Sequence, residues 1–139
     1  MTALQWLRRT VGTWSSERRY LFAPAFKPVN MTTEFTISEG NNGKFIVDWS
    51  GQTAGQMVLT LDGDTLHRSR DYFGDGANSS KVEVIDHDCI VLRTQYDGMR
   101  FREEVRMIEE DCFRLRQTVG YDLETGQLRL AGQYIETRI

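Results

Sequence analysis

Cysteine, histidine and proline are scarce in this sequence, with two of each among 139 residues. The two cysteines, Cys89 and Cys112, are too few for a disulfide framework and lack the close spacing of a zinc site. We therefore expect both to be reduced thiols. An isolated histidine is more often a surface residue than a catalytic base or a metal ligand. We expect no metal site.

Long apolar runs and an excess of positive charge are also missing. Nowhere do 18 apolar residues follow one another, and the first nine residues lack the apolar stretch of a secretory signal. We expect a soluble, unsecreted protein that makes no membrane contact. The net charge is -3, so no basic surface points to nucleic acid as a partner.

Common catalytic motifs are absent as well. The sequence contains no GxSxG, HExxH, P-loop or GxGxxG, which are the usual signatures of hydrolases, zinc proteases and nucleotide-binding proteins. At this length the chain fits one domain, residues 1–139, with a substantial core.

What is present is a β pattern behind one short helix. Apolar residues at helical spacing from Leu4 to Val11 predict a helix within residues 2–10, with Thr2 as N-cap and Gly12 as stop. Alternating segments separated by turns such as Asp97-Gly98 then predict about ten short strands. This order favours an antiparallel barrel or sandwich over a parallel sheet. A barrel of this size can hold one small ligand.

The first predicted strand carries mixed chemistry on one face. Trp14, Ser16, Arg18 and Tyr20 are two residues apart and therefore point the same way. Tryptophan beside arginine favours a polar-lined cavity over solvent or a dry core. The alternative is a core tryptophan with an arginine that reaches water at the strand end.

Later strands add charged residues to apolar faces. Glu103 shares a face with Phe101 and Val105, so it is expected to face inward and to need a partner. Glu136 shares its face with Tyr134 and is likewise expected inside.

For two further strands the inward face is ambiguous. Their candidate inward residues are Leu66, Arg68, Arg70 and Tyr72 on one strand, and Arg114, Arg116 and Thr118 on the other. The alternative for each is a solvated barrel exterior.

Buried charges of this kind suggest a ligand. An unpaired buried charge costs several kcal/mol, so arginines and carboxylates inside one small barrel are explained best by a polar partner. That partner would carry carboxylates to match arginine and ring nitrogens to match Glu103 or Glu136. It would also have a flat apolar body to lie against Trp49 and Tyr72.

The chain resembles the S/U-type phycobiliprotein lyases, relatives of the lipocalins and fatty-acid-binding proteins. These lyases carry linear tetrapyrroles (bilins) to cysteines of light-harvesting proteins. The similarity lies in motifs spread in order along the chain, namely Gly12-x-Trp14-x-Ser16-x-Arg18, Val47-x-Trp49, Arg68-x-Arg70-x-Tyr72, Thr94-x-Tyr96 followed by Glu103, Arg114-x-Arg116 and Glu136-x-Arg138. The resemblance implies an all-β, up-and-down calycin barrel of about ten strands.

The resemblance also implies roles for particular residues. Arg18, with Arg70 or Arg114, would bind the propionates of the bilin, and Glu103 or Glu136 would accept hydrogen bonds from its pyrrole nitrogens. Trp49 and Tyr72 would pack on the pigment, and Thr118 would complete the ligand site. Arg18 and Glu136 are the expected catalytic residues. Arg138 would be structural, stacked over Trp14.

The implied activity is that of a chromophore lyase, which promotes thioether formation between phycoerythrobilin or phycocyanobilin and a cysteine of an apo-phycobiliprotein subunit. The bilin is then the ligand, and no tightly bound cofactor is expected. The expected location is the cyanobacterial cytosol or the plastid stroma, and a homodimer remains open. The alternatives are a non-catalytic carrier of a fatty acid, a bilin or another hydrophobic carboxylate, and an interaction module with an empty core.

Overall fold

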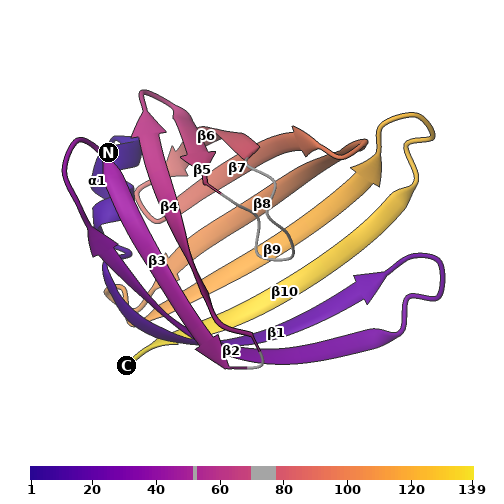
Figure 1. Ribbon diagram of the computed structural model, residues 1–139, viewed down its shortest axis with the longest axis horizontal. Coiled ribbons are helices and arrows are strands. Elements are labelled where there is room, and N and C mark those ends of the chain that lie inside the picture. The colour runs from indigo at the N-terminus through magenta and orange to yellow at the C-terminus, as the bar shows by residue number, and fades with distance from the viewer. Residues whose placement is uncertain (52, 70–77) are drawn as a thin grey trace.

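The computed structural model describes residues 1–51, 53–69 and 78–139, and within them it has one helix followed by ten strands (Figure 1). The elements are α1 (Ala3–Arg8), β1 (Gly12–Phe22), β2 (Pro28–Glu39), β3 (Lys44–Gly51), β4 (Gly55–Asp62), β5 (Thr65–Arg68), β6 (Asn78–Asp86), β7 (Cys89–Tyr96), β8 (Met99–Ile108), β9 (Phe113–Asp122) and β10 (Leu128–Arg138).

The strands form a closed antiparallel barrel. Each strand pairs with the next along the chain, and β1 also pairs with β10, which closes the ring. Tight turns make this meander possible. Asn42-Gly43 and Asp97-Gly98 both have positive φ at both residues, as the two-residue turns of twisted hairpins require. The predicted fold is confirmed as an up-and-down barrel, which removes the sandwich alternative.

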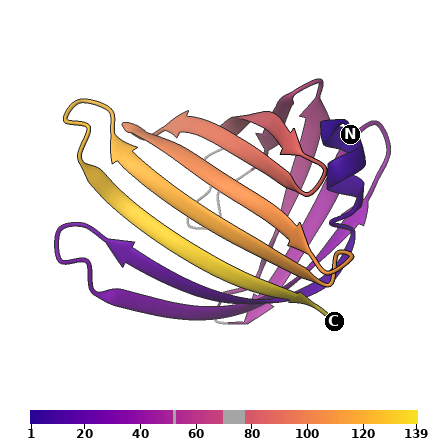
Figure 2. The ribbon, with the colours of Figure 1, turned by 180° about the vertical axis from the view of Figure 1, so that it is seen from behind.

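The short helix α1 lies beside the N-terminus at one end of the barrel, and the C-terminus lies at the same end, away from the helix (Figures 1 and 2). Thr2 caps it by accepting from the backbone of Gln5, whose side chain in turn accepts from the backbone N–H of Thr2. Trp6 and Leu7 are buried against the barrel interior. The predicted N-cap is therefore confirmed.

The end of the helix differs from the prediction. The helix ends at Arg8, and Val11, which was expected on its apolar face, is 37% exposed. Gly12 does not stop the helix but begins β1, with φ +139. A Cβ there would lie 2.4 Å from the guanidinium of Arg138. Gly12 is thus required for the close approach of Arg138, which the sequence spacing could not reveal.

Alternation along the strands decides what faces inward. On β1, Trp14, Ser16, Arg18 and Tyr20 are all buried, as predicted. The apolar core joins Trp6 and Leu7 of α1 to inward side chains of β1 through β8. Its most buried members, each less than 3% exposed, are Trp6, Trp14, Phe35, Phe45, Val47, Met57 and Ile90.

The ambiguous strand β9 turns its arginines inward. Arg114, Arg116 and Thr118 are buried, whereas Phe113 and Leu115 are exposed. On the other ambiguous strand, Leu66 of β5 is buried and Arg68 is half-buried. Arg70 and Tyr72 lie outside the described residues.

Candidate functional site

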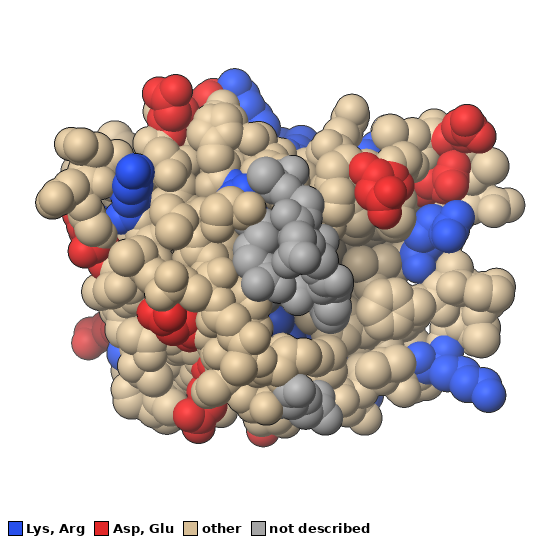
Figure 3. Space-filling model, in the orientation of Figure 1, with Lys and Arg blue, Asp and Glu red and all other residues tan. Residues whose placement is uncertain are grey.

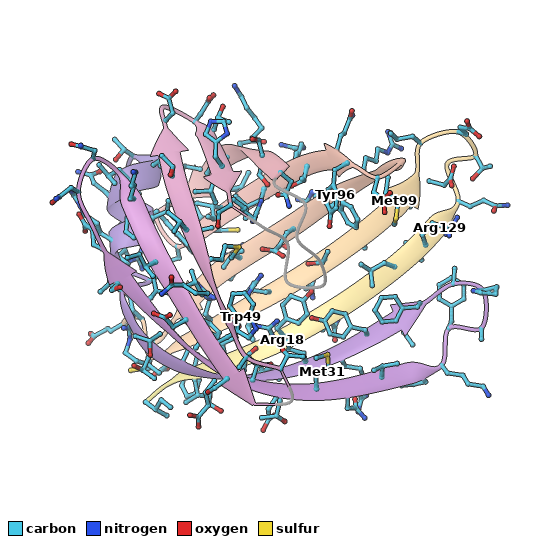
Figure 4. All side chains as sticks on the ribbon, viewed as in Figure 1. Arg18, Met31, Trp49, Tyr96, Met99 and Arg129 are labelled. Carbon is cyan, nitrogen blue, oxygen red and sulfur yellow. The ribbon has the colours of Figure 1, made fainter. Side chains whose placement is uncertain are left out.

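A cavity of about 940 Å³ runs through the barrel from α1 toward the opposite end. Trp6 and Leu7 line it at the helix end, and Phe22, Tyr96 and Met99 line it near the hairpin turns at the other end. Figure 4 shows Tyr96, Met99 and Arg129 at that end, away from Arg18. The volume is that of a site for a drug-sized ligand or cofactor.

One wall of the cavity holds a cluster of arginines around Glu136. β9 and β10 pair so that Arg114 lies opposite Glu136. Arg114 donates from Nε to Oε1 of Glu136 at 2.6 Å, and Arg116 donates to Oε2 at 3.4 Å. A guanidinium nitrogen of Arg18, on β1, lies 3.9 Å from the same Oε2. Glu136 is thus the shared counter-ion of three buried arginines.

The electrostatics of Glu136 follow from this arrangement. Burial alone would raise the pKa of a carboxyl group that has no solvent exposure. Arg114 and Arg116 together outweigh burial and lower the pKa of Glu136 to about 2. Glu136 is therefore ionised throughout the physiological pH range.

Glu103 forms a second acidic centre beside the first. It lies on β8 opposite Thr118 of β9. Arg116 donates to both oxygens of Glu103, at 3.0 and 3.1 Å, and the Thr118 hydroxyl donates at 2.9 Å. Burial opposes ionisation, but Arg116 and Arg68 outweigh it and lower the pKa of Glu103. The predicted partner for Glu103 is therefore found in Arg116.

Arg68 stands in a polar cluster on a different part of the barrel wall. It donates to Asn78 at 3.1 Å and also to Ser80, which is in turn hydrogen-bonded to Thr94. These side chains come from β5, β6 and β7, which β8 separates from β9 and β10 in the ring of strands. The cavity is therefore lined with cationic groups at more than one point of its circumference.

Aromatic rings complete the charged wall. The guanidinium carbon of Arg18 lies 5.3 Å from the Tyr134 ring centroid and 6.0 Å from that of Phe35. The guanidinium of Arg116 lies 4.8 Å from the Tyr134 ring. Burial, aided by Glu103, raises the pKa of Tyr134, so its hydroxyl stays protonated. A neutral donor thus lies next to the ion pairs.

Arg138 occupies the structural position predicted for it. Its guanidinium carbon is 4.3 Å from the centroid of Trp14. Its nitrogens donate to the backbone carbonyls of Arg9, Val11 and Asp111. Arg138 thereby ties the last strand to the segment between α1 and β1.

The predicted ligand residues fall into three groups. Arg18, Glu103, Arg114 and Thr118 line the cavity. Two others, Glu136 and Trp49, are buried behind its surface and are not among the described lining residues.

Trp49 belongs to the hydrophobic core and lies over Gly55, where a Cβ would be 2.5 Å from the indole ring. The remaining two predicted residues, Arg70 and Tyr72, lie outside the described residues. The structure places the other six side chains, and the roles of all eight toward a ligand stay predictions.

Several cavity residues were missing from the predicted ligand set. Arg116 and Arg68 were noted as parts of motifs but were not assigned to the ligand, and Tyr134 was assigned to an inward face only. Strand alternation with Glu136 already placed Tyr134 inside, so that signal was present. The role of Arg116 as the bridge between Glu103 and Glu136 depends on register across three strands.

The outer surface differs from this interior. On the face seen in Figure 3, acidic and basic side chains are interspersed, with no broad patch of one sign.

In the described part of the chain, no three His, Cys, Asp or Glu residues are grouped so that they could hold a metal ion. No described helix has the length and apolarity needed to cross a membrane.

Fold and cavity together define the class, an up-and-down β-barrel with charged side chains around an interior cavity. The chain belongs to the CpeS-like protein family, whose family model matches residues 48–139. This membership confirms the resemblance that the motifs indicated.

Individual relatives agree with the family. The chain is similar to CpcV of Picosynechococcus sp., named as a candidate chromophore lyase, at 25% identity over 95% of this chain and 79% of that protein. It is also similar to CpcS 2 of Nostoc sp., named as a candidate phycocyanobilin lyase, at 25% identity over 98% of this chain and 90% of that protein.

Solved structures share the barrel. The S-type phycobiliprotein lyase CpeS from Guillardia theta matches with a TM-score of 0.73 and 15% identity, over 100% of this chain and 93% of that one. Rv2717c from M. tuberculosis matches with a TM-score of 0.59 and 11% identity, over 99% and 97%. At these identities the likeness shows the fold alone.

Proposed function

We propose that this protein binds a linear tetrapyrrole in its cavity and promotes its covalent attachment to a cysteine of a phycobiliprotein subunit. The observation that carries the proposal is the cluster of buried arginines and glutamates on the wall of a ligand-sized cavity. Of the two relatives named above, one is a candidate chromophore lyase and the other a candidate phycocyanobilin lyase, which supports the same activity here.

The charge of the cavity wall suits a ligand with carboxylates. Among the described interior residues, four arginines (Arg18, Arg68, Arg114 and Arg116) accompany two glutamates, an excess of two positive charges. A bilin carries two propionates, and guanidinium groups bind carboxylates with paired, charge-assisted hydrogen bonds. Arg18 and Arg114 are our candidates for this role, since both line the cavity.

The two glutamates differ in access to the ligand. Glu103 lines the cavity and its side chain is 17% exposed, whereas the Glu136 side chain is fully buried. Glu103 is therefore the better candidate to accept hydrogen bonds from the pyrrole nitrogens. Glu136 would act through the arginines that it holds in place, as a positioning residue.

The chemical step needs an orienting cavity and an external thiolate. The sulfur of the acceptor cysteine adds to the exocyclic ethylidene carbon of the bilin, so that a C–S bond forms. The former double bond becomes single, and a proton is added to the adjacent ring carbon. Holding the pigment in one conformation with that carbon at the cavity mouth lowers the entropic cost of addition.

This protein's own buried cysteine is a poor nucleophile for such a step. Cys89 has no solvent exposure, and burial together with a hydrogen bond to Glu104 raises its pKa to about 11. The thiolate, not the thiol, is the nucleophile. The scheme therefore uses the cysteine of the acceptor protein and requires no further cofactor.

Pigment transfer tests the proposal directly. The purified protein is mixed with phycocyanobilin or phycoerythrobilin, and then with an apo-phycobiliprotein subunit. We expect a visible-absorbing complex, followed by an acceptor band that fluoresces with zinc after denaturing electrophoresis. Binding without transfer would indicate a carrier or chaperone, and binding of fatty acid in preference to bilin would contradict the assignment.

Substitution of Arg18 tests where the bilin binds. Replacing Arg18 by alanine removes a charge-assisted interaction worth roughly 1.5–3 kcal/mol, so bilin affinity should fall about tenfold or more. The matched control is Arg93→Ala, which removes an exposed arginine paired with Glu83 on the outer wall. Unchanged bilin affinity in a folded Arg18→Ala protein would show that the pigment binds elsewhere.

A further inference from the structure

The cavity continues past the arginines to an enclosed chamber under α1. In Figure 4, Arg18 lies between α1 and the end that Tyr96 and Met99 mark. On the helix side, the described lining residues include Trp6, Thr10 and a set of buried apolar side chains, namely Leu7, Ile37, Val47, Met57, Ile90 and Val105. These residues define what we call the inner chamber, and none of them carries a charge.

The inner chamber is closed, and the cavity opens at the other end. Trp6, Leu7 and Thr10 are each at most 6% exposed, whereas Phe22, which lines the cavity beside the hairpin turns, is 41% exposed. A ligand that enters between the described strand ends therefore passes the arginines before it reaches the helix. The part of the ligand that reaches the chamber is removed from water.

Trp6 brings one unsatisfied hydrogen-bond donor to the chamber. Its Nε1 is buried and finds no acceptor among the described residues. Trp14 shows the ordinary situation, because its Nε1 donates to the backbone carbonyl of Thr10 at 2.9 Å. A buried donor without an acceptor lowers the stability of the folded state. An acceptor on a bound ligand would remove this penalty.

The chamber favours a neutral acceptor. Thr10, its other polar side chain, already donates its hydroxyl hydrogen to the carbonyl of Leu7 at 2.6 Å. A carboxylate here would be buried without a cationic partner among the residues of the chamber, which is strongly unfavourable. A carbonyl oxygen carries no net charge and accepts readily from an N–H donor. The expected occupant is therefore an apolar group that carries a carbonyl.

A linear tetrapyrrole has such a group at each end. Its propionates lie on the two central rings, and each terminal ring is a lactam with small alkyl substituents, one carbonyl and one N–H. With the propionates at Arg18 and Arg114, as proposed above, one terminal ring extends toward the hairpin turns and the other toward α1. The ethylidene-bearing ring lies at the open end, where the acceptor thiolate can reach it. The opposite terminal ring then lies in the inner chamber.

We propose that the inner chamber binds the terminal lactam ring of the bilin that does not carry the ethylidene, with Trp6 donating from Nε1 to the carbonyl oxygen of that ring. The inference rests on the proposed function and adds the direction in which the pigment lies. A fatty acid bound through the same arginines would place only its hydrocarbon tail in the chamber and would leave the Trp6 donor unsatisfied. Trp6 therefore distinguishes a bilin from a fatty acid.

A pair of half-bilins tests the contact. The probes are a dipyrrinone, which has one lactam ring and one propionate-bearing ring, and its lactim methyl ether, in which the carbonyl oxygen is methylated. In titration calorimetry, the wild type should bind the dipyrrinone more tightly. Trp6→Phe keeps an aromatic ring but removes the N–H, so this preference should shrink about fivefold to tenfold. Because each protein is titrated with both probes, an effect of the substitution on stability cancels.

Trp14→Phe is the matched control. It also removes a buried indole N–H, but that N–H is already bonded within the chain, and Trp14 is not among the described lining residues. The preference of Trp14→Phe for the lactam should equal that of the wild type, whatever happens to its affinity for the two probes together.

The indole N–H signals of isotope-labelled wild type in nuclear magnetic resonance give an independent measurement. The Trp6 signal, assigned by its loss in Trp6→Phe, should move downfield when phycocyanobilin binds and should not do so when oleate binds. A bound bilin with an unmoved Trp6 signal would overturn this inference alone, as would a lactam preference that Trp6→Phe leaves unchanged. A wild-type protein that binds no bilin would overturn the proposed function, and this inference with it.

Discussion

Removing the charge of Glu136 should destabilise the folded protein by about 3 kcal/mol at neutral pH. Glu136 is fully buried and serves Arg18, Arg114 and Arg116 as their common counter-ion. Its pKa is about 2 in the folded protein against an ordinary value of 4.5, which corresponds to roughly 3 kcal/mol. A loss of this size agrees with the roughly 3–5 kcal/mol lost when one partner of a buried ion pair is removed.

The same pKa fixes the pH range of the effect. The folded pKa of Glu136 is below the unfolded one, so its stabilisation is fully present above about pH 4.5. It is lost as the pH falls toward 2, where the carboxyl group becomes protonated in both states. The difference in stability between wild type and Glu136→Gln should therefore be largest near pH 7 and shrink below pH 4.

Urea unfolding followed by tryptophan fluorescence measures this difference. At a slope of about 1.5–2 kcal/mol/M, the midpoint of Glu136→Gln should lie about 1.5–2 M below that of wild type at pH 7. Glu34→Gln, which neutralises an exposed glutamate on β2, serves as the control and should not change the midpoint. Equal midpoints for Glu136→Gln and wild type at pH 7, or a gap that does not change with pH, would refute the counter-ion role.

Three further outcomes follow from the structure. Trp14→Ala should lower the unfolding free energy by roughly 3–5 kcal/mol in urea titrations. Trp14 is fully buried, and its indole donates to a backbone carbonyl at 2.9 Å. A loss under 1 kcal/mol would contradict its core role. Gly55→Ala should cost about 1–3 kcal/mol, since the new Cβ would meet the Trp49 ring, and an unchanged thermal midpoint would contradict that contact. Alkylation of the exposed Cys112, checked by mass spectrometry, should leave pigment transfer intact, whereas loss of transfer would show that this thiol takes part.

The barrel itself could be predicted from the sequence because its signals are local. Alternation places residues two apart on one face, and turn residues mark where one strand ends and the next begins. The inward face of the first strand was predicted on this basis, from Trp14 and Arg18, and is confirmed. The predicted helix end was wrong. Gly12 serves the close approach of Arg138 instead, and that contact brings together residues far apart in the sequence.

The charged site was only partly predictable, because alternation does not decide between two mixed faces. On β9 the rule that apolar residues face inward would have placed Phe113 and Leu115 inside and Arg114 outside. The structure has the reverse, because the register with β10 sets Arg114 against Glu136 in the interior. Such a pairing depends on which strands are neighbours and in what register, so it cannot be read from one strand.

The pairing of β1 with β10 has a consequence for how the chain folds and for when it aggregates. Every other strand pairing among the described residues joins elements that follow each other, so those hairpins can form one after another with little loop-closure entropy. The pair of Trp14 and Arg138 closes the ring only when both ends of the chain have been ordered. A chain that lacks its last strand would leave β1 and β9 as two unpaired edges with exposed backbone donors and acceptors. Because such edges recruit strands from other molecules, aggregation is the expected fate of a C-terminally truncated protein, before any loss of pigment binding could be measured.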